Sequence, residues 1–284
     1  MPIAPFPVWL NGELLAPAEA QVSVFDHGLT TGDGVFEVVL IHRGSPFALA
    51  RHLARLAHSA AGLGLVAPSE AELRAACEAV TTASGLTDGR LRATVTGGTG
   101  PLGSDRWESA TTVVVAASAL ELSPAPAAVA TVPWPRNERG ALAGLKTTSY
   151  AENVVALAHA RSVAASEAIF ANLAGQLCEG TGSNVFLGAA GRLVTPPLAS
   201  GCLAGVTRAL VIEGLLAAGI VEVAEEDLPV GRLEDAEEAF LASTTRGVQP
   251  ISTVDGRGLA HCPGPLTVAA GTAYSAILEA GGDP

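Results

Sequence analysis

The stretch LKTTSY, residues 145–150, contains Lys146, the only lysine of this 284-residue chain. The other fifteen of its sixteen cationic residues are arginines. Arginine replaces lysine readily on solvated surfaces, but only an amine that can lose its proton forms a Schiff base with an aldehyde. A general bias toward arginine therefore does not explain the one exception, and Lys146 is the first candidate for chemistry.

Three further segments place polar groups beside glycine turns. Glu179 follows a short predicted strand and precedes a tight glycine turn, 180–184. The loop 201–205 leads into a predicted helix, and the unpaired N–H groups at such a helix start form an anion site. The hydroxyls of 243–245 end a predicted strand. Each segment alone is ordinary, but with the lysine they supply an amine for an aldehyde, an acid for a ring nitrogen and donors for a phosphate, as pyridoxal phosphate (PLP) requires.

Composition excludes several classes of protein. The chain is 49% hydrophobic and 15% charged, unlike a disordered chain, and carries a formal net charge of −12, unlike a nucleic-acid binder with a basic face. No apolar stretch approaches the roughly 20 residues of a membrane-spanning helix, and the start lacks the pattern of a signal peptide. We therefore expect a cytoplasmic protein. The four cysteines show no zinc-ligand spacing, so we expect no metal.

Secondary-structure signals are mixed without strict alternation, which predicts an α+β fold. Asn11-Gly12 between two short apolar runs predicts a hairpin, and a β-branched run over 35–41 predicts a buried strand. A capping-box pattern at 69–72 predicts the start of a helix that ends near 84, and a further helix is expected over 150–165. Strands are expected over 167–172, 176–179, 184–187, 193–195 and 238–243. A proline-containing linker is expected at 121–127. We expect a smaller N-terminal domain over 1–120 and a larger, cofactor-binding domain over 128–284.

The chain resembles the class IV aminotransferases of PLP fold type IV, a family with D-amino-acid and branched-chain aminotransferases and aminodeoxychorismate lyases. The resemblance runs from 8–12 to 243–245, and its most specific pieces are 146–150, 179–186, and 195–197 followed by 205–208. It implies two domains with the cofactor in the cleft between them. Because the family builds its sites at a dimer interface, it also implies a homodimer.

The resemblance assigns roles by position. Lys146 would form the Schiff base and shuttle the proton, Glu179 would pair with the pyridine nitrogen, and Arg55 matches the phosphate-binding arginine. The other implied cofactor residues are Tyr150, Ser183, Asn184, Val206, Thr207, Ser243 and Thr244. The substrate side would include Phe36, Glu37, Thr245 and the loop 97–105, which in this family can come from the partner subunit. His52 and His58 are expected to be packing or surface groups.

The resemblance leaves three substrate classes open. The segments 32–39 and 243–245 look most like D-amino-acid aminotransferases, although the Arg-x-His pair of those enzymes is replaced here by 100–104. We expect a transaminase that moves an amino group between a D-amino acid and a 2-oxo acid, with (R)-amines as further donors. An aminodeoxychorismate lyase and a branched-chain aminotransferase are the alternatives. For the substrate carboxylate, Arg92 is the first candidate, because strand alternation places it on one face with Arg90, and Arg246 is the second.

Overall fold

The computed structural model describes residues 6–107, 109–120, 125–221 and 223–284, so part of the predicted linker, 121–124, lies outside the described residues. Contacts divide the chain into two compact units. The first comprises the described residues of 1–121 together with 145–150 and 281–284, and the second those of 122–144 and 151–280. The stretch that contains the lysine therefore packs with the first unit.

The first unit is built on an antiparallel sheet. Its six strands are β1 (Val8–Leu10), β2 (Glu13–Leu15), β3 (Gly34–His42), β4 (Ser45–Pro46), β5 (Gly89–Thr96) and β6 (Thr112–Ala119), in the order β2-β1-β6-β5-β3-β4. The predicted hairpin is confirmed, because β1 and β2 pair across Asn11 and Gly12, both at positive φ. β3 and β5 pair along eight residues, from Gly34 with Thr96 to Ile41 with Gly89.

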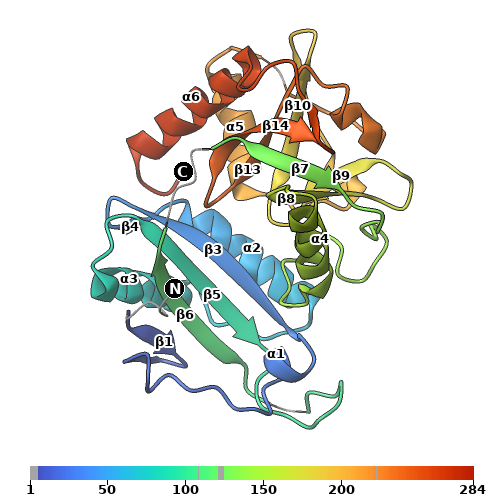
Figure 1. The fold of residues 1–284 in the computed structure, drawn as a ribbon. Coiled ribbons are helices and arrows are strands. Elements are labelled where there is room, and N and C mark those ends of the chain that lie inside the picture. Colours follow the sequence, from blue (N-terminus) through green and yellow to red (C-terminus); the bar gives the residue numbers. More distant parts are fainter. Residues whose placement is uncertain (1–5, 108, 121–124, 222) are drawn as a thin grey trace. The chain divides into compact units, whose positions relative to one another are not determined.

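Helices α2 (Leu49–Gly62) and α3 (Glu70–Ser84) pack on this sheet, and a short helix, α1 (His27–Thr30), precedes β3 (Figure 1). α3 begins with the predicted capping box, in which Ser69 and Glu72 satisfy each other's backbone N–H groups. The buried core takes Val35, Val39 and Ile41 from alternate positions of β3. Glu37 belongs to the same alternation and therefore points toward the helices, whereas Phe36 points to the opposite face of the sheet.

The second unit contains a nine-stranded mixed sheet. Its strands are β7 (Ala127–Thr131), β8 (Glu167–Ala171), β9 (Leu177–Gly180), β10 (Asn184–Ala189), β11 (Arg192–Thr195), β12 (Val223–Glu225), β13 (Glu238–Ser243), β14 (Gly247–Val254) and β15 (Arg257–Gly258). The order is β12-β11-β10-β13-β14-β7-β8-β9, with β15 paired to β14. The predicted strands of this region are present, but β7, β12 and β15 were not predicted, and neither was β14. Pro250 lies in its middle, paired with Phe240, and proline usually argues against an interior strand.

Three helices complete the second unit: α4 (Ala151–Ser162), α5 (Val206–Ala217) and α6 (Pro265–Ala280), with short 3₁₀ turns at Leu198–Ser200 and Val230–Leu233. α4 ends three residues before the predicted boundary, and Ala164 follows it at positive φ. α5 and α6 pack together beside β13 and β14 (Figure 1). The predicted α+β class is thus confirmed, and no helix among the described residues is long and apolar enough to cross a membrane.

Candidate active site

The backbone of the lysine segment is attached to β3 and α2. The Phe36 N–H donates to the Lys146 carbonyl at 3.0 Å, and the Thr148 N–H donates to the Gly34 carbonyl at 2.8 Å. On its other side, the Lys146 N–H donates to the Ser59 hydroxyl of α2 at 3.1 Å. The segment thus lies along β3 as a short additional strand, which fixes the position from which the lysine side chain projects.

The Phe36 ring gathers three of the predicted site residues around it. The Lys146 ammonium nitrogen lies 4.5 Å from the ring centroid, and the Arg92 guanidinium carbon lies 3.7 Å from it. The Tyr150 ring packs edge-on at 5.3 Å with an interplanar angle of 76°. Cations over an aromatic face are held by the ring quadrupole. The first unit therefore places the amine, a second cation and two aromatic rings in one cluster.

Arg92 lies on β5, where its register opposite Val38 brings it diagonally across from Phe36. The side chain as a whole is exposed, yet the guanidinium rests against the ring, and this local loss of water lowers its pKa. Arg90, two residues earlier on the same face, instead donates to the Ser118 hydroxyl at 2.9 Å. Of these two arginines, Arg92 is the one that accompanies the lysine.

Glu37 is fully buried and binds two side chains of α2. Its Oε1 accepts from Arg55 Nε at 2.7 Å and its Oε2 from Arg55 Nη2 at 2.8 Å, and Oε2 also lies 2.7 Å from His52 Nδ1. His52, Arg55 and Ser59 are spaced three and four residues apart, so they share one helix face. Glu37 was predicted to line the substrate side, but the structure directs its carboxylate to Arg55 and His52.

The charges of this buried cluster depend on one another. Burial alone would raise the pKa of the Glu37 carboxyl, but Arg55 and His52 outweigh that effect and lower it to about 2. Burial lowers the pKa of the His52 imidazole, against the opposing effect of Glu37. Both shifts mean that the folded state takes up protons less readily than the unfolded chain, so both contribute stability that is lost on acidification.

We expect Glu37→Gln to remove part of this acid sensitivity. In the unchanged protein the Glu37 group contributes stability above its ordinary pKa of 4.5, and the contribution is lost as the pH falls toward 2. By pH 3 this group should have lost about 2 kcal/mol of its contribution to the free energy of unfolding. Urea unfolding measured from pH 7 downward should therefore show a shallower loss for Glu37→Gln, from a lower starting stability.

Glu13→Gln, at an exposed position of the same unit, is the matched control and should keep the slope of the unchanged protein. If Glu37→Gln kept that slope as well, the Glu37 carboxylate would not be the group that titrates.

In the second unit, Glu179 on β9 is oriented by two neighbours. Its Oε2 accepts from the Leu203 N–H at 2.9 Å, and its Oε1 lies 3.6 Å from Arg136 Nε. Arg136 also donates to Asn153 Oδ1 at 3.1 Å and lies over the Phe170 ring at 4.2 Å. Arg136 was not predicted as a site residue, because it follows Pro135 in an irregular segment with no periodicity to mark it. The contact places a cation beside the predicted ring-nitrogen partner.

The start of α5 is a polar cradle. Gly205 occupies the N-cap position with no side-chain cap, and Val206 and Thr207 follow it, both buried. The Asn184 amide donates to the Leu203 carbonyl at 2.9 Å, and a Cβ at Gly205 would overlap with Asn184 Oδ1. Asn184 pairs in register with Ala242, the residue before Ser243. The predicted residues of 184, 206, 207 and 243 are thus brought to one region of the second unit.

The hydroxyls of this region differ in their partners. Ser243 Oγ is buried and has no hydrogen-bond partner among the described residues, which suits a donor that awaits a ligand. The Thr207 hydroxyl is within hydrogen-bond reach of Tyr274, whose pKa is raised to about 12 by burial. Thr244 and Thr245 lie half-buried in the turn between β13 and β14. An uncapped helix start with an unpartnered hydroxyl in the same region fits a phosphate group.

Two other predicted residues meet at a buried acid. Arg246 Nη1 lies 2.5 Å from Glu167 Oε2, and the Ser183 hydroxyl donates to the same oxygen at 3.4 Å. Glu167 is fully buried at the start of β8, and it also accepts from the N–H and the hydroxyl of Thr181. Sequence analysis did not single out Glu167. The charge of Arg246 is therefore already compensated by a carboxylate, unlike that of Arg92, which makes no ion pair with a described residue.

Gly205→Ala should weaken cofactor binding. The added Cβ meets Asn184, which holds Leu203, whose N–H in turn orients Glu179. We expect PLP affinity, measured by titrating the apoprotein and following the absorbance of the bound cofactor, to fall by about tenfold or more. Gly271→Ala in α6 is the control, since a Cβ there meets open space and should stabilise the helix slightly. Equal PLP affinity of Gly205→Ala and the unchanged protein would contradict the cradle.

Comparison with known proteins places these features in one family. The family described as amino-transferase class IV matches residues 34–254. A candidate branched-chain-amino-acid aminotransferase of Methanocaldococcus jannaschii is 34% identical, over 88% of each chain. A D-alanine aminotransferase of Bacillus licheniformis is 32% identical, over 92% of this chain and 93% of its own.

A solved structure shows the same fold. A hypothetical aminotransferase of Mycobacterium tuberculosis, solved in its PLP-bound form, superimposes with a TM-score of 0.86 at 27% identity, covering 96% of this chain and 99% of its own. The fold of this chain is therefore one that holds PLP in a solved relative. The curated relatives include proteins named for D-alanine and for branched-chain amino acids.

Proposed function

Because the chain belongs to the class IV aminotransferases, which use PLP, we propose that it transfers amino groups between a D-amino acid and a 2-oxo acid, with (R)-amines as further donors. The observation that carries this proposal is the cluster in which the only lysine and Arg92 contact one ring, that of Phe36. An amino acid needs an amine-exchanging group and a cation for its carboxylate, and the first unit offers both.

Lys146 is the catalytic residue of this proposal. When bound, PLP supplies an aldehyde that accepts the amino group and a ring that accepts electrons. The Lys146 amine would hold the cofactor in the resting enzyme and would take the proton from the substrate Cα. The backbone bonds to β3 and α2 orient this amine.

The cofactor roles are proposed residue by residue. Arg55 and the start of α5, with Val206, Thr207, Ser243 and Thr244, serve the phosphate, while Glu179 keeps the ring nitrogen protonated. Asn184, Ser183 and Tyr150 support these groups. We propose that Glu37 acts on the cofactor through Arg55 rather than by touching substrate.

Arg92 is the residue proposed to bind the substrate carboxylate. Its guanidinium carries five N–H donors, and the ring contact leaves the ends of the fork for a carboxylate. Arg246, the other candidate, is held by Glu167 and would have to leave that ion pair. Phe36 and Thr245 complete the proposed substrate side. This division of roles explains a carboxylate site without the Arg-x-His pair.

A branched-chain aminotransferase is the second candidate, favoured by the relative of 34% identity. The D-amino-acid reading is favoured by the segments 32–39 and 243–245 and by the D-alanine aminotransferase of 32% identity. The lyase remains an outcome of the test below.

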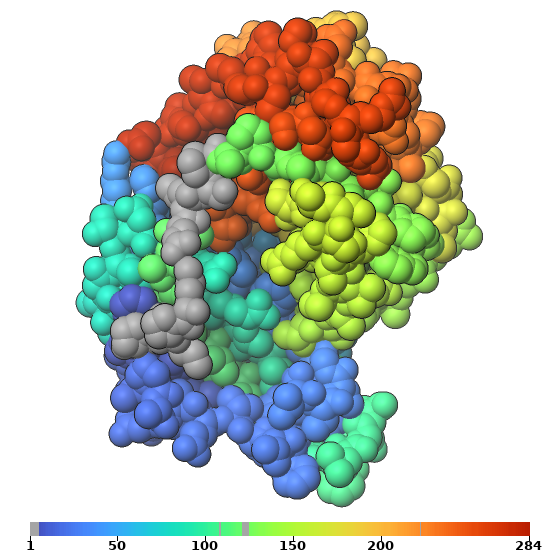
Figure 2. All heavy atoms as spheres, viewed as in Figure 1, coloured from blue at the N-terminus to red at the C-terminus, as the bar shows by residue number. Residues whose placement is uncertain are grey.

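We also propose that the enzyme works as a homodimer. The first unit exposes large apolar side chains on two adjacent segments: Val24, Phe25, Leu29, Leu102 and Trp107. Leu102 is 77% exposed and Trp107 75% exposed, and such side chains gathered on neighbouring loops mark an interaction surface. The segments (blue and blue-green) project together at the surface in Figure 2. A second copy of this chain is the partner that the family implies.

A half-reaction panel tests the proposed function. The PLP-loaded enzyme is mixed with D-alanine, D-glutamate, L-leucine, (R)-1-phenylethylamine or aminodeoxychorismate, and the change in cofactor absorbance and any pyruvate are measured. The proposal expects D-alanine or D-glutamate to convert the cofactor fastest. Conversion by L-leucine alone would identify a branched-chain enzyme, and pyruvate release from aminodeoxychorismate would identify a lyase.

The same panel, run on Arg92→Ala, tests carboxylate recognition. Binding of the amino-acid donor should weaken by about 1.5–3 kcal/mol, the value of a charge-assisted hydrogen bond, while the (R)-amine, which has no carboxylate, should react as before. Arg90→Ala is the matched control, because Arg90 lies on the same face but bonds to Ser118. Equal losses for both donors would assign Arg92 a structural role, and no loss would direct attention to Arg246.

A further inference from the structure

The loop that follows β5 is docked on the segment around α1. The Gly97 N–H donates to the Asp33 carbonyl at 3.0 Å, and the Gly100 N–H donates to the Phe25 carbonyl at 3.1 Å. In the opposite direction, the His27 N–H donates to the Gly98 carbonyl at 2.8 Å. A Cβ at Gly97 would overlap with the Asp33 carboxylate, so glycine is required for this approach. The loop 97–107 is therefore held in a defined position against residues 25–33.

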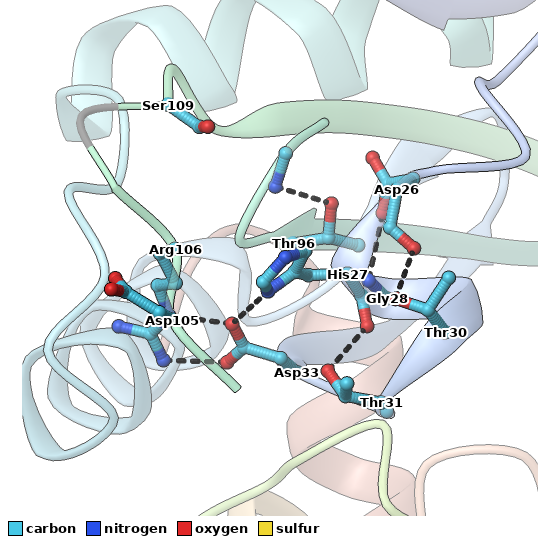
Figure 3. Close-up of polar contacts among 12 residues, drawn as sticks. Asp26, His27, Gly28, Thr30, Thr31, Asp33, Thr96, Asp105, Arg106 and Ser109 are labelled. Atoms are coloured by element: carbon cyan, nitrogen blue, oxygen red, sulfur yellow. Dashed lines mark hydrogen bonds and ion pairs between the residues drawn. The ribbon is translucent and has the colours of Figure 1, made fainter. Parts of the chain in front are cut away.

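Arg106 joins this loop to two other elements. Its Nε lies 2.5 Å from Asp33 Oδ2 and its Nη2 lies 2.5 Å from Asp33 Oδ1. The two side chains point toward one another in Figure 3. Nη2 also donates to the Leu63 carbonyl at 2.8 Å and Nη1 to the Gly64 carbonyl at 3.1 Å, both just beyond the end of α2. One planar guanidinium thus binds the loop to the turn before β3 and to the helix that carries Arg55.

The turn held by Arg106 also holds the lysine segment. The Gly32 carbonyl accepts from the Thr148 hydroxyl at 2.8 Å and from the Ser149 hydroxyl at 2.9 Å. On the far side of Asp33, the Gly34 carbonyl accepts from the Thr148 N–H. Asp33 therefore lies between two residues whose carbonyls fix the chain two and three positions after Lys146.

A cavity of about 480 Å³ opens at this junction. Its lining includes Arg106 and Ser104 from the loop, Asp33 from the turn, and Ser149 from the lysine segment. A displacement of the loop would change the wall of this cavity and, through Asp33, the support of the lysine segment.

We propose that Arg106 and Asp33 form a positioning pair that sets substrate affinity by holding the loop 97–107 and the turn 32–34 in one arrangement. The inference rests on the transaminase activity proposed above but not on the choice of donor. Loss of Asp33 leaves the Arg106 guanidinium without its carboxylate partner, and loss of Arg106 leaves the Asp33 carboxylate with the His27 ring nitrogen 3.8 Å away. Both changes fall in a half-buried place, where Arg106 is 29% and Asp33 14% exposed. Neither Arg106 nor Asp33 is among the residues assigned to the cofactor.

Kinetics of single and double variants test the pair. With D-alanine as donor, or L-leucine if the unchanged enzyme accepts only that, and 2-oxoglutarate as acceptor, Arg106→Ala should raise the donor KM about tenfold, and kcat should stay within about threefold. The absorbance of the bound cofactor should be unchanged. Arg106→Lys should recover little, because one ammonium cannot span the carboxylate and both carbonyls. The double variant Arg106→Ala, Asp33→Ala should lose no more than the worse single variant.

Arg74→Ala is the matched control. Arg74 lies in the same unit, is 32% exposed, and makes ion pairs with Glu70 and Asp283 rather than with the loop. Its loss should therefore leave KM unchanged. Losses that multiply in the double variant, or a fall in kcat with an unchanged KM, would overturn the positioning pair.

Hydrogen exchange provides a readout that needs no substrate. Arg106→Ala should speed amide exchange in peptides that cover 97–107 and 146–150, while Arg74→Ala should leave both as in the unchanged protein. Unchanged exchange in Arg106→Ala would overturn the inference even if the donor panel succeeds. Faster exchange with a failed donor panel would support the pair and reject only the proposed donor.

Discussion

The buried Glu37 carboxylate is the constraint on which the first half of the site depends. A charge on the interior face of β3 costs several kcal/mol unless it is paired and hydrogen-bonded. α2 meets that requirement with Arg55 and His52, so the helix is held in one rotation against the sheet. In that rotation Ser59 accepts the backbone N–H of Lys146. A single buried acid thereby connects Arg55, the proposed phosphate ligand, with Lys146, the proposed catalytic residue.

The second unit uses acids in the same way. Glu167 is fully buried and paired with Arg246, and Glu179 lies beside Arg136 with one oxygen bonded to the Leu203 backbone. Arg246 and Arg136 are therefore both paired with carboxylates of the second unit. Arg92 differs, because its guanidinium rests on an aromatic ring. Of the two candidates, Arg246 is paired with a carboxylate and Arg92 with none among the described residues, which supports the proposal that Arg92 binds the substrate carboxylate.

Much of the fold could be predicted from the sequence, and Lys146 could be singled out as a candidate, because both leave local signals. The hairpin at Asn11-Gly12, the capping box at Ser69 and the lysine among arginines are read directly from neighbouring residues. The partners of Glu37, the contact of Arg136 with Glu179, and the pairing of Arg106 with Asp33 join residues 15 to 73 positions apart. Pairs that lie so far apart in the chain leave no periodic signal in the sequence. β14 was not predicted because proline, here Pro250, is disfavoured inside a strand.

Lys146 is the residue proposed to carry the cofactor. Borohydride reduction of the PLP-loaded enzyme, followed by proteolysis and mass spectrometry, tests it most directly, because reduction converts the linkage between cofactor and amine into a stable secondary amine. The account predicts the phosphopyridoxyl group on the peptide that contains Lys146, the only lysine of the chain, and no label there in Lys146→Ala. Label confined to the N-terminal amine of the unchanged enzyme would contradict it.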